Sequence, residues 1–259
     1  MGVVQTGGLT VRDFMSKNVL TAYSHSNVTK AIEIMADRNI GSVVVIDSAG
    51  PRGIFTERDL LSKVLTRNRR PETTLIMEVM SPLFADIGPF DSLEQAAKKM
   101  LTKKSRLMVF EGEDLAGIVT ATDIVKAVHA QGRRFDISKV ISRRMTTVRP
   151  DTPVESAVME MDRKRVGSVI VVKDGKPWGI FTERDLLLKI LAPKVKLSTP
   201  VAEVATTPLT RAEMGINGKE AADIMVSKRV KRLPLFEDDI MVGIVTARDL
   251  VEAFATSSR

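Results

Sequence analysis

Gly53-Ile54-Phe55-Thr56-Glu57-Arg58-Asp59-Leu60 is the stretch that decides the fold, because close variants of it occur in four places along the chain. The other three are Gly117-Ile118-Val119-Thr120-Ala121-Thr122-Asp123-Ile124, Gly179-Ile180-Phe181-Thr182-Glu183-Arg184-Asp185-Leu186 and Gly243-Ile244-Val245-Thr246-Ala247-Arg248-Asp249-Leu250. Successive copies are separated by 64, 62 and 64 residues. Repetition at a nearly fixed spacing indicates one supersecondary unit per copy, and such units bury their apolar faces by packing against each other.

The four copies fall into two alternating kinds. Copies one and three carry Thr-Glu-Arg-Asp, and each has a Gly-Ser pair ahead of its first apolar run, at Gly41-Ser42 and Gly167-Ser168. Copies two and four carry Thr-Ala-x-Asp, and the corresponding position is basic, with Arg106 in copy two and Lys231-Arg232 in copy four. The larger repeat is therefore a pair of copies with a period of 126 residues (53 to 179).

Each copy predicts a helix, two strands and a second helix, preceded by an extended segment. In copy one, the apolar or small residues between 28 and 35 recur at i, i+3, i+4 and i+7, which is the spacing of one helix face. The apolar runs 42–46 and 53–55 are rich in β-branched residues and flank a Gly-Pro turn, which favours strands covered on both faces. The second helix is expected to begin at Thr-x-x-Asp, so the fold class is α/β.

The Thr-x-x-Asp motif stands where a strand ends and a helix begins. The first backbone N–H groups of a helix lack partners within the helix, and the helix dipole is positive there, which favours a phosphate or another polar ligand. The aspartate adds two acceptor oxygens that match the vicinal hydroxyls of a ribose. The alternative is that the motif is a capping box that only starts the helix. The residues concerned are Thr56, Asp59, Thr120, Asp123, Thr182, Asp185, Thr246 and Asp249.

An apolar strand that runs into Gly-x-x-Thr-x-x-Asp resembles the signature of the cystathionine-β-synthase (CBS) domain family. The resemblance covers nearly the whole chain, and residues 11–16 and 79–82 look like the family's opening segment. It implies β-α-β-β-α repeats that pair as Bateman modules, in a stand-alone protein of prokaryotic or archaeal kind. The organisation is similar to that of the γ subunit of AMP-activated protein kinase, in which such modules form a flat disc.

The resemblance also implies two modules of two CBS domains each. The first would span 1–132, with domains at 9–66 and 74–129. The second would span 133–259, with domains at 138–191 and 200–255. The chain could form one disc by itself or assemble as a homodimer.

Proteins of this family bind AMP, ADP, ATP or S-adenosylmethionine between paired sheets, with the motif aspartate on the ribose. The resemblance therefore implies an adenine-nucleotide sensor that regulates a protein target not identified by the sequence. Arg106, Lys231 and Arg232 are expected to contact phosphate, as are Arg58 and Arg184. Because the two kinds of copy differ in this way, we expect each module to hold a nucleotide between a ribose-binding copy and a phosphate-binding copy.

Composition bears on the other functions. The chain has no cysteine and only His25 and His129, which argues against a thiolate nucleophile, a zinc site and a Ser-His-Asp triad. It has no phosphate-binding P-loop and no dinucleotide Gly-x-Gly-x-x-Gly, so catalysis and a metal site are not expected. A net charge of +7 leaves nucleic-acid binding as an alternative, although one Trp and one Tyr offer little base stacking. A cytoplasmic protein without a membrane span is expected.

Overall fold

In the computed structural model, which describes residues 9–82, 85–103 and 106–257, all four copies follow the predicted order of elements. The α/β fold class is thereby confirmed.

Copy one consists of β1 (Thr21–Tyr23), α2 (Val28–Asp37), β2 (Ser42–Asp47), β3 (Gly50–Thr56) and α3 (Glu57–Asp59). Copy two consists of β5 (Asp86–Ile87), α5 (Leu93–Lys103), β6 (Leu107–Glu111), β7 (Asp114–Val119) and α6 (Ala121–Gln131). Copy three consists of β8 (Thr147–Val148), α7 (Val154–Lys164), β9 (Ser168–Lys173), β10 (Lys176–Thr182) and α8 (Glu183–Asp185). Copy four consists of β11 (Ala212–Glu213), α9 (Gly218–Lys228), β12 (Arg232–Glu237), β13 (Ile240–Thr246) and α10 (Ala247–Thr256).

Each copy builds its own small sheet. The short first strand pairs in parallel with the second, as β1 does with β2, because the intervening helix supplies the crossover that parallel strands need. The second and third strands form an antiparallel hairpin. The helix residues that were expected to face the core, such as Val28 and Met35, are fully buried.

The second helix begins at the motif threonine in every copy, as predicted, but it continues differently in the two kinds of copy. In copies two and four it is an ordinary α-helix, α6 or α10. In copies one and three only three α-helical residues precede a π-helical stretch, at Leu60–Val64 and Leu186–Leu191. In copy one a 3-10 turn, Leu65–Arg67, follows.

The segments that open the copies are exchanged between neighbours along the chain. The segment with α1 (Val11–Phe14), which opens copy one, continues to Ser16, and Ser16 pairs with Ile118 of copy two. The segment with α4 (Ile76–Val79) and β4 (Ser81–Pro82), which opens copy two, pairs with β3 of copy one. Copies three and four exchange their segments in the same way, through the 3-10 turns Ser138–Val140 and Val201–Glu203 and the residues after them.

The motif glycines allow this close approach. A side chain at Gly53 would lie 2.6 Å from the carbonyl oxygen of Ser81, and one at Gly117 would lie 2.9 Å from the sulfur of Met15. The contact with the Ser81 carbonyl is too short for any Cβ, so glycine is required at Gly53, and at Gly117 the carbonyl oxygen of Ser16 would also lie only 3.0 Å away. The glycine of the motif therefore serves the exchanged segment.

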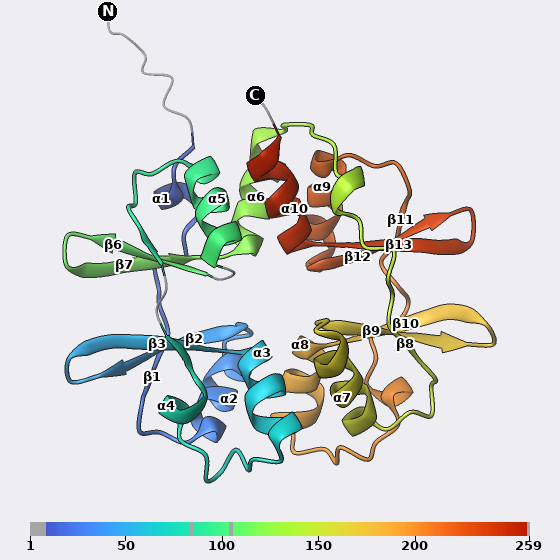
Figure 1. Ribbon diagram of the computed structural model, residues 1–259, viewed down its shortest axis with the longest axis horizontal. Helices are drawn as coiled ribbons and strands as arrows, with labels where there is room; N and C mark the ends of the chain where they lie inside the picture. The colour runs from blue at the N-terminus through green and yellow to red at the C-terminus, as the bar shows by residue number, and fades with distance from the viewer. Residues whose placement is uncertain (1–8, 83–84, 104–105, 258–259) are drawn as a thin grey trace, which may run out of the picture. The chain divides into compact units, whose positions relative to one another are not determined.

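The described chain divides into two compact units that do not follow its two halves (Figure 1). The odd unit holds copies one and three, residues 19–83 and 144–209. The even unit holds copies two and four, with the described residues 9–18, 85–103, 106–143 and 210–257. Each unit groups copies whose helices pack together. The predicted modules instead group copies that would share a ligand, so the module boundaries stay a prediction.

The cores of the two units differ. The even unit has one continuous apolar core, to which copies two and four both contribute. The odd unit has two cores, and each takes leucines from the other copy: Leu187 lies in the core of copy one and Leu61 in that of copy three. None of the helices in the described part of the chain has the length and apolar character that a bilayer span requires.

Candidate ligand-binding site

The threonine and aspartate of the motif lie against each other in all four copies. One carboxylate oxygen, Oδ2, accepts a hydrogen bond from the threonine backbone N–H, at distances of 3.0, 3.0, 2.9 and 2.7 Å from copy one to copy four. In copies one to three, the threonine hydroxyl also donates to that oxygen. The arrangement is a capping box, which accounts for the helix start and leaves the second oxygen, Oδ1, for other contacts.

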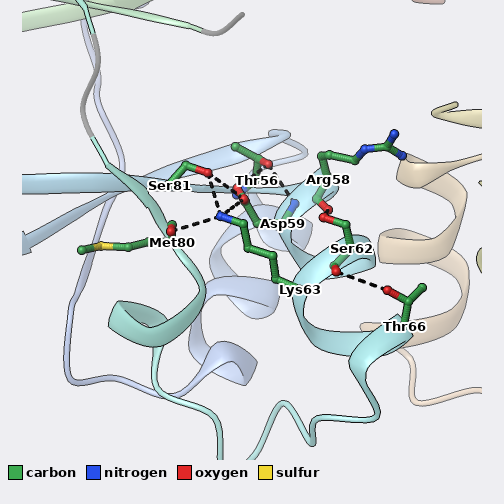
Figure 2. A network of polar contacts seen from close by, with 8 residues as sticks. All are labelled: Thr56, Arg58, Asp59, Ser62, Lys63, Thr66, Met80 and Ser81. Carbon is green, nitrogen blue, oxygen red and sulfur yellow. Dashed lines mark hydrogen bonds and ion pairs between the residues drawn. The ribbon is translucent and has the colours of Figure 1, made fainter. Parts of the chain in front are cut away.

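In copy one, Oδ1 of Asp59 is engaged by two donors (Figure 2). The hydroxyl of Ser81 donates to it at 2.8 Å, and the Lys63 ammonium lies 2.7 Å away. Lys63 also donates to the carbonyl oxygen of Met80 at 3.1 Å. Because Met80 and Ser81 belong to the exchanged opening segment, Asp59 and Lys63 together tie that segment to the motif.

Copy three repeats this network with equivalent residues. Thr206 takes the place of Ser81 and donates to Oδ1 of Asp185 at 2.9 Å. Lys189 lies 2.7 Å from the same oxygen and donates to the carbonyl oxygen of Val204 at 2.9 Å. The Asp59 and Asp185 side chains are only 7% and 8% exposed, so both carboxylates are buried and paired with a cation.

The aspartates of copies two and four have fewer partners. Lys126 lies 2.9 Å from Oδ1 of Asp123. Among the residues that the structure describes, no cation lies within ion-pair distance of Asp249, whose carboxylate is held by Thr246 alone. Burial raises the pKa of Asp249, and the nearby negative charge of Glu252 raises it further, while the hydrogen bonds from Thr246 oppose the shift.

Copy four also brings its basic residues to the motif. Arg232 is paired in register with Thr246 across β12 and β13, and the carbonyl of Lys231 accepts the N–H of Ala247 at 2.8 Å. In copy two the pairing of β6 with β7 begins one residue after Arg106, with Leu107. The strand hairpin thus carries the basic position to the start of the second helix, as the sequence comparison of the copies suggested.

In copies one and three the equivalent position is serine, and the motif arginines point elsewhere. Arg58 pairs with Glu183 at 3.2 Å and donates to the carbonyl of Val166 at 2.8 Å. Arg184 pairs with Glu57 at 3.2 Å and donates to the carbonyl of Asn39 at 3.0 Å. Both arginines therefore join copy one to copy three, and a phosphate contact by either stays a prediction.

The sequence contains a pattern from which these cross-copy ion pairs could have been predicted. Glu-Arg occurs at the same place in copies one and three only, and two such segments facing each other are self-complementary in charge. The glycine of the Gly-Ser pair also serves these ion pairs. A side chain at Gly41 would lie 2.9 Å from the Glu57 carboxylate, so the glycine makes room for the glutamate that Arg184 contacts.

Comparisons with known proteins agree with the repeat. The family model described as CBS domain matches residues 11–66, 76–130, 137–192 and 198–256. Protein MJ1225 of Methanocaldococcus jannaschii, proposed to be an archaeal homologue of γ-AMPK, has a similar structure. The TM-score is 0.79 at 19% identity, over 95% of this chain and 100% of that one, a likeness that establishes the shared fold.

Curated relatives include proteins of known and unknown activity. An uncharacterised 33.4 kDa protein from a ribosomal RNA operon of Thermofilum pendens is 31% identical over 71% of this chain. The inosine-5'-monophosphate dehydrogenase of Thermoplasma acidophilum is 32% identical over 46% of this chain and 24% of the enzyme. The chain spans 65% of the Thermofilum protein and 62% of an uncharacterised M. jannaschii relative, MJ1404, which is less than two thirds of either.

Proposed function

Because the chain belongs to the CBS domain family, we propose that it is a regulatory protein that binds an adenine nucleotide, AMP, ADP or ATP, and catalyses no reaction itself. The observation that carries the proposal is the threonine–aspartate pair at the start of the second helix in all four copies. The pair places a hydroxyl and a carboxylate within one turn at the start of a helix, which suits a phosphorylated ribose.

Two further observations support a nucleotide over an adenosine compound without phosphate. The basic pair Lys231-Arg232 lies beside the motif of copy four, where it would attract phosphate. The fold is shared with a protein proposed to be related to γ-AMPK. S-adenosylmethionine offers the same ribose but no phosphate, so it is the alternative ligand against which the nucleotides should be compared.

A bound nucleotide would act on a protein target by favouring one arrangement of the chain over another. A ligand can shift such an equilibrium only as far as its affinities for the two states differ. The exchanged opening segments give binding a route to the rest of the chain, because Ser142 pairs with Ile244, two residues before the motif threonine of copy four, from a segment that leads into copy three. The target itself has no candidate in the sequence.

Isothermal titration calorimetry of the whole chain with AMP, ADP, ATP and S-adenosylmethionine tests the proposal. We expect saturable binding of at least one nucleotide, and loss of binding when all four motif aspartates are changed to asparagine. Asp174→Asn is the matched control, because Asp174 lies in an exposed hairpin turn with positive φ, which asparagine tolerates. A folded chain that gives no heat with any of the four ligands would contradict the proposal.

A further inference from the structure

The four motif aspartates differ in what occupies their second carboxylate oxygen. In copies one, two and three a lysine ammonium lies 2.7, 2.9 and 2.7 Å from Oδ1 of the aspartate. In copies one and three a hydroxyl donates to the same oxygen at 2.8 and 2.9 Å. Within the described residues, Asp249 of copy four has neither a lysine nor a second hydroxyl on its carboxylate.

The sequence sets this difference directly. Copies one and three place lysine four residues after the aspartate, at Lys63 and Lys189, and copy two places Lys126 three residues after it. Both spacings bring side chains together on a helix. Copy four has Glu252 and Ala253 at these two positions, so the cation is replaced by an anion at one and by a methyl group at the other.

A ligand hydroxyl must compete with these lysines. Oδ2 is bound to the threonine N–H in every copy, so the acceptor capacity left for a ribose is on Oδ1. In copies one and three a ribose would displace a charged donor and a hydroxyl from a buried carboxylate. Hydrogen bonds to charged groups are stronger than those between neutral groups, so such displacement opposes binding. In copy four the ribose would instead donate to Oδ1 of Asp249, on which the described residues place neither a lysine nor a hydroxyl.

On the premise of the proposed function, we propose that a lysine on a motif aspartate competes with the ribose hydroxyls for Oδ1 and so weakens nucleotide binding in that copy. Copy four, in which the described residues place no lysine on Asp249, is then the preferred nucleotide site. Asp249 then receives the ribose hydroxyls, and the backbone of Lys231-Arg232 pairs with the start of the same helix. Asp59 and Asp185 are instead structural and fasten the exchanged segments. The raised pKa of Asp249 agrees with this assignment, because a partly buried carboxylate without a cation gains from new donors.

Exchanging the charges at one helical position tests the inference without touching the motif. Glu252 is exposed, and Lys126 is half exposed, with 51% of its side chain accessible. Glu252→Lys places a lysine three residues after Asp249, as in copy two, and should weaken the tightest AMP or ATP binding at least tenfold. Lys126→Glu removes the competitor in copy two and should strengthen or add a second binding event. Glu252→Gln, which removes the anion without adding a cation, should change affinity less than threefold.

Asparagine variants assign the site. Asp249→Asn should abolish the tightest binding event or weaken it at least tenfold, whereas Asp59→Asn and Asp185→Asn should change its affinity less than threefold while lowering thermal stability. Tight binding that survives Asp249→Asn and is lost in Asp59→Asn or Asp185→Asn would overturn the inference and leave the proposed function intact. Absence of nucleotide binding in the unmodified chain would overturn both. Circular dichroism of each variant shows that the fold is kept.

Discussion

The odd and even units use the same repeat but join their two copies by different physical means. In the odd unit, reciprocal Arg–Glu pairs connect the motif turns, and leucines cross from one core to the other. In the even unit, the copies share one apolar core, in which the rings of Phe135 and Phe254 lie 5.9 Å apart. Glu-Arg after the motif threonine supplies the ion pairs of the odd unit, and the even copies have alanine in place of that glutamate.

This difference bears on how function is divided among the copies. From sequence alone, copies one and three differ from copies two and four in bearing fewer basic residues beside the motif. The structure adds that the odd aspartates hold lysines and the odd arginines hold the neighbouring copy. The motif side chains of the odd unit are thus engaged in contacts within that unit. We therefore propose the even unit as the main site of nucleotide binding.

Breaking the shared aromatic core should have the largest effect. Phe254 is 1% exposed, packs on Phe135, and carries the Arg133 guanidinium 5.3 Å from its ring centre. Removing a buried phenylalanine side chain costs about 3–5 kcal/mol, so Phe254→Ala should lower the free energy of unfolding by that amount in urea titrations. Phe90→Ala, at a site that is 67% exposed, is the control and should cost far less. Equal losses in the two variants would mean that the even core is not continuous.

Breaking the cross-copy ion pairs should have an intermediate effect on the odd unit. The Glu57 and Glu183 side chains are 9% and 13% exposed, while their arginine partners are about one third exposed. Because solvent screens such a pair in part, Arg58→Ala should cost roughly 1–3 kcal/mol rather than the 3–5 kcal/mol of a fully buried pair. A double-mutant cycle with Glu183→Ala isolates the pair, and a coupling energy near zero would show that the contact does not hold the copies together.

Replacing single motif aspartates should lower the free energy of unfolding by a smaller amount, which differs between the two units. Asp59→Asn removes the partner of Lys63 and should cost about 1.5–3 kcal/mol. Asp249→Asn should change the free energy of unfolding little at neutral pH. Burial raises the pKa of Asp249, so its ionised form destabilises the folded chain. Urea titrations of the two variants at neutral pH compare these costs.

The same pKa shift predicts a pH dependence with a definite sign. The folded-state pKa of Asp249 lies above the ordinary value of 3.8, so the destabilisation by its charge is complete above the raised pKa and disappears as the pH falls toward 3.8. The unmodified chain should therefore gain stability relative to Asp249→Asn over that window when the pH is lowered. An opposite trend would mean that an unrecognised cation holds the Asp249 carboxylate.

The sequence predicted the elements of each copy because local patterns encode them. Helix starts at Thr56, Thr120, Thr182 and Thr246 follow from the capping box, and the two strands follow from apolar runs between turns. The exchange of opening segments could not be predicted, since a segment such as that ending at Ser81 carries no local mark of the sheet edge that receives it. The π-helical stretches were not predicted either, and they carry Leu61 and Leu187, which lie in the core of the other copy.

For the candidate site, the sequence placed the residues but not their partners. It predicted that threonine and aspartate would meet, and the structure agrees. The lysine contacts were within reach of sequence reasoning, because Asp59–Lys63 and Asp185–Lys189 have the i, i+4 spacing of helical ion pairs. The joining of copy one to copy three through Arg58 and Arg184 required the tertiary structure, since the partners lie 125 and 127 residues away along the chain.

Native mass spectrometry of the whole chain, incubated with equal amounts of AMP, ADP, ATP and S-adenosylmethionine, tests whether copy four is the nucleotide site. We expect the chain to retain an adenine nucleotide in preference to S-adenosylmethionine, and we expect Asp249→Asn to lose this bound mass while Asp59→Asn keeps it. A folded chain that retains none of the four ligands, or that retains its nucleotide in Asp249→Asn and loses it in Asp59→Asn, would show that copy four is not that site.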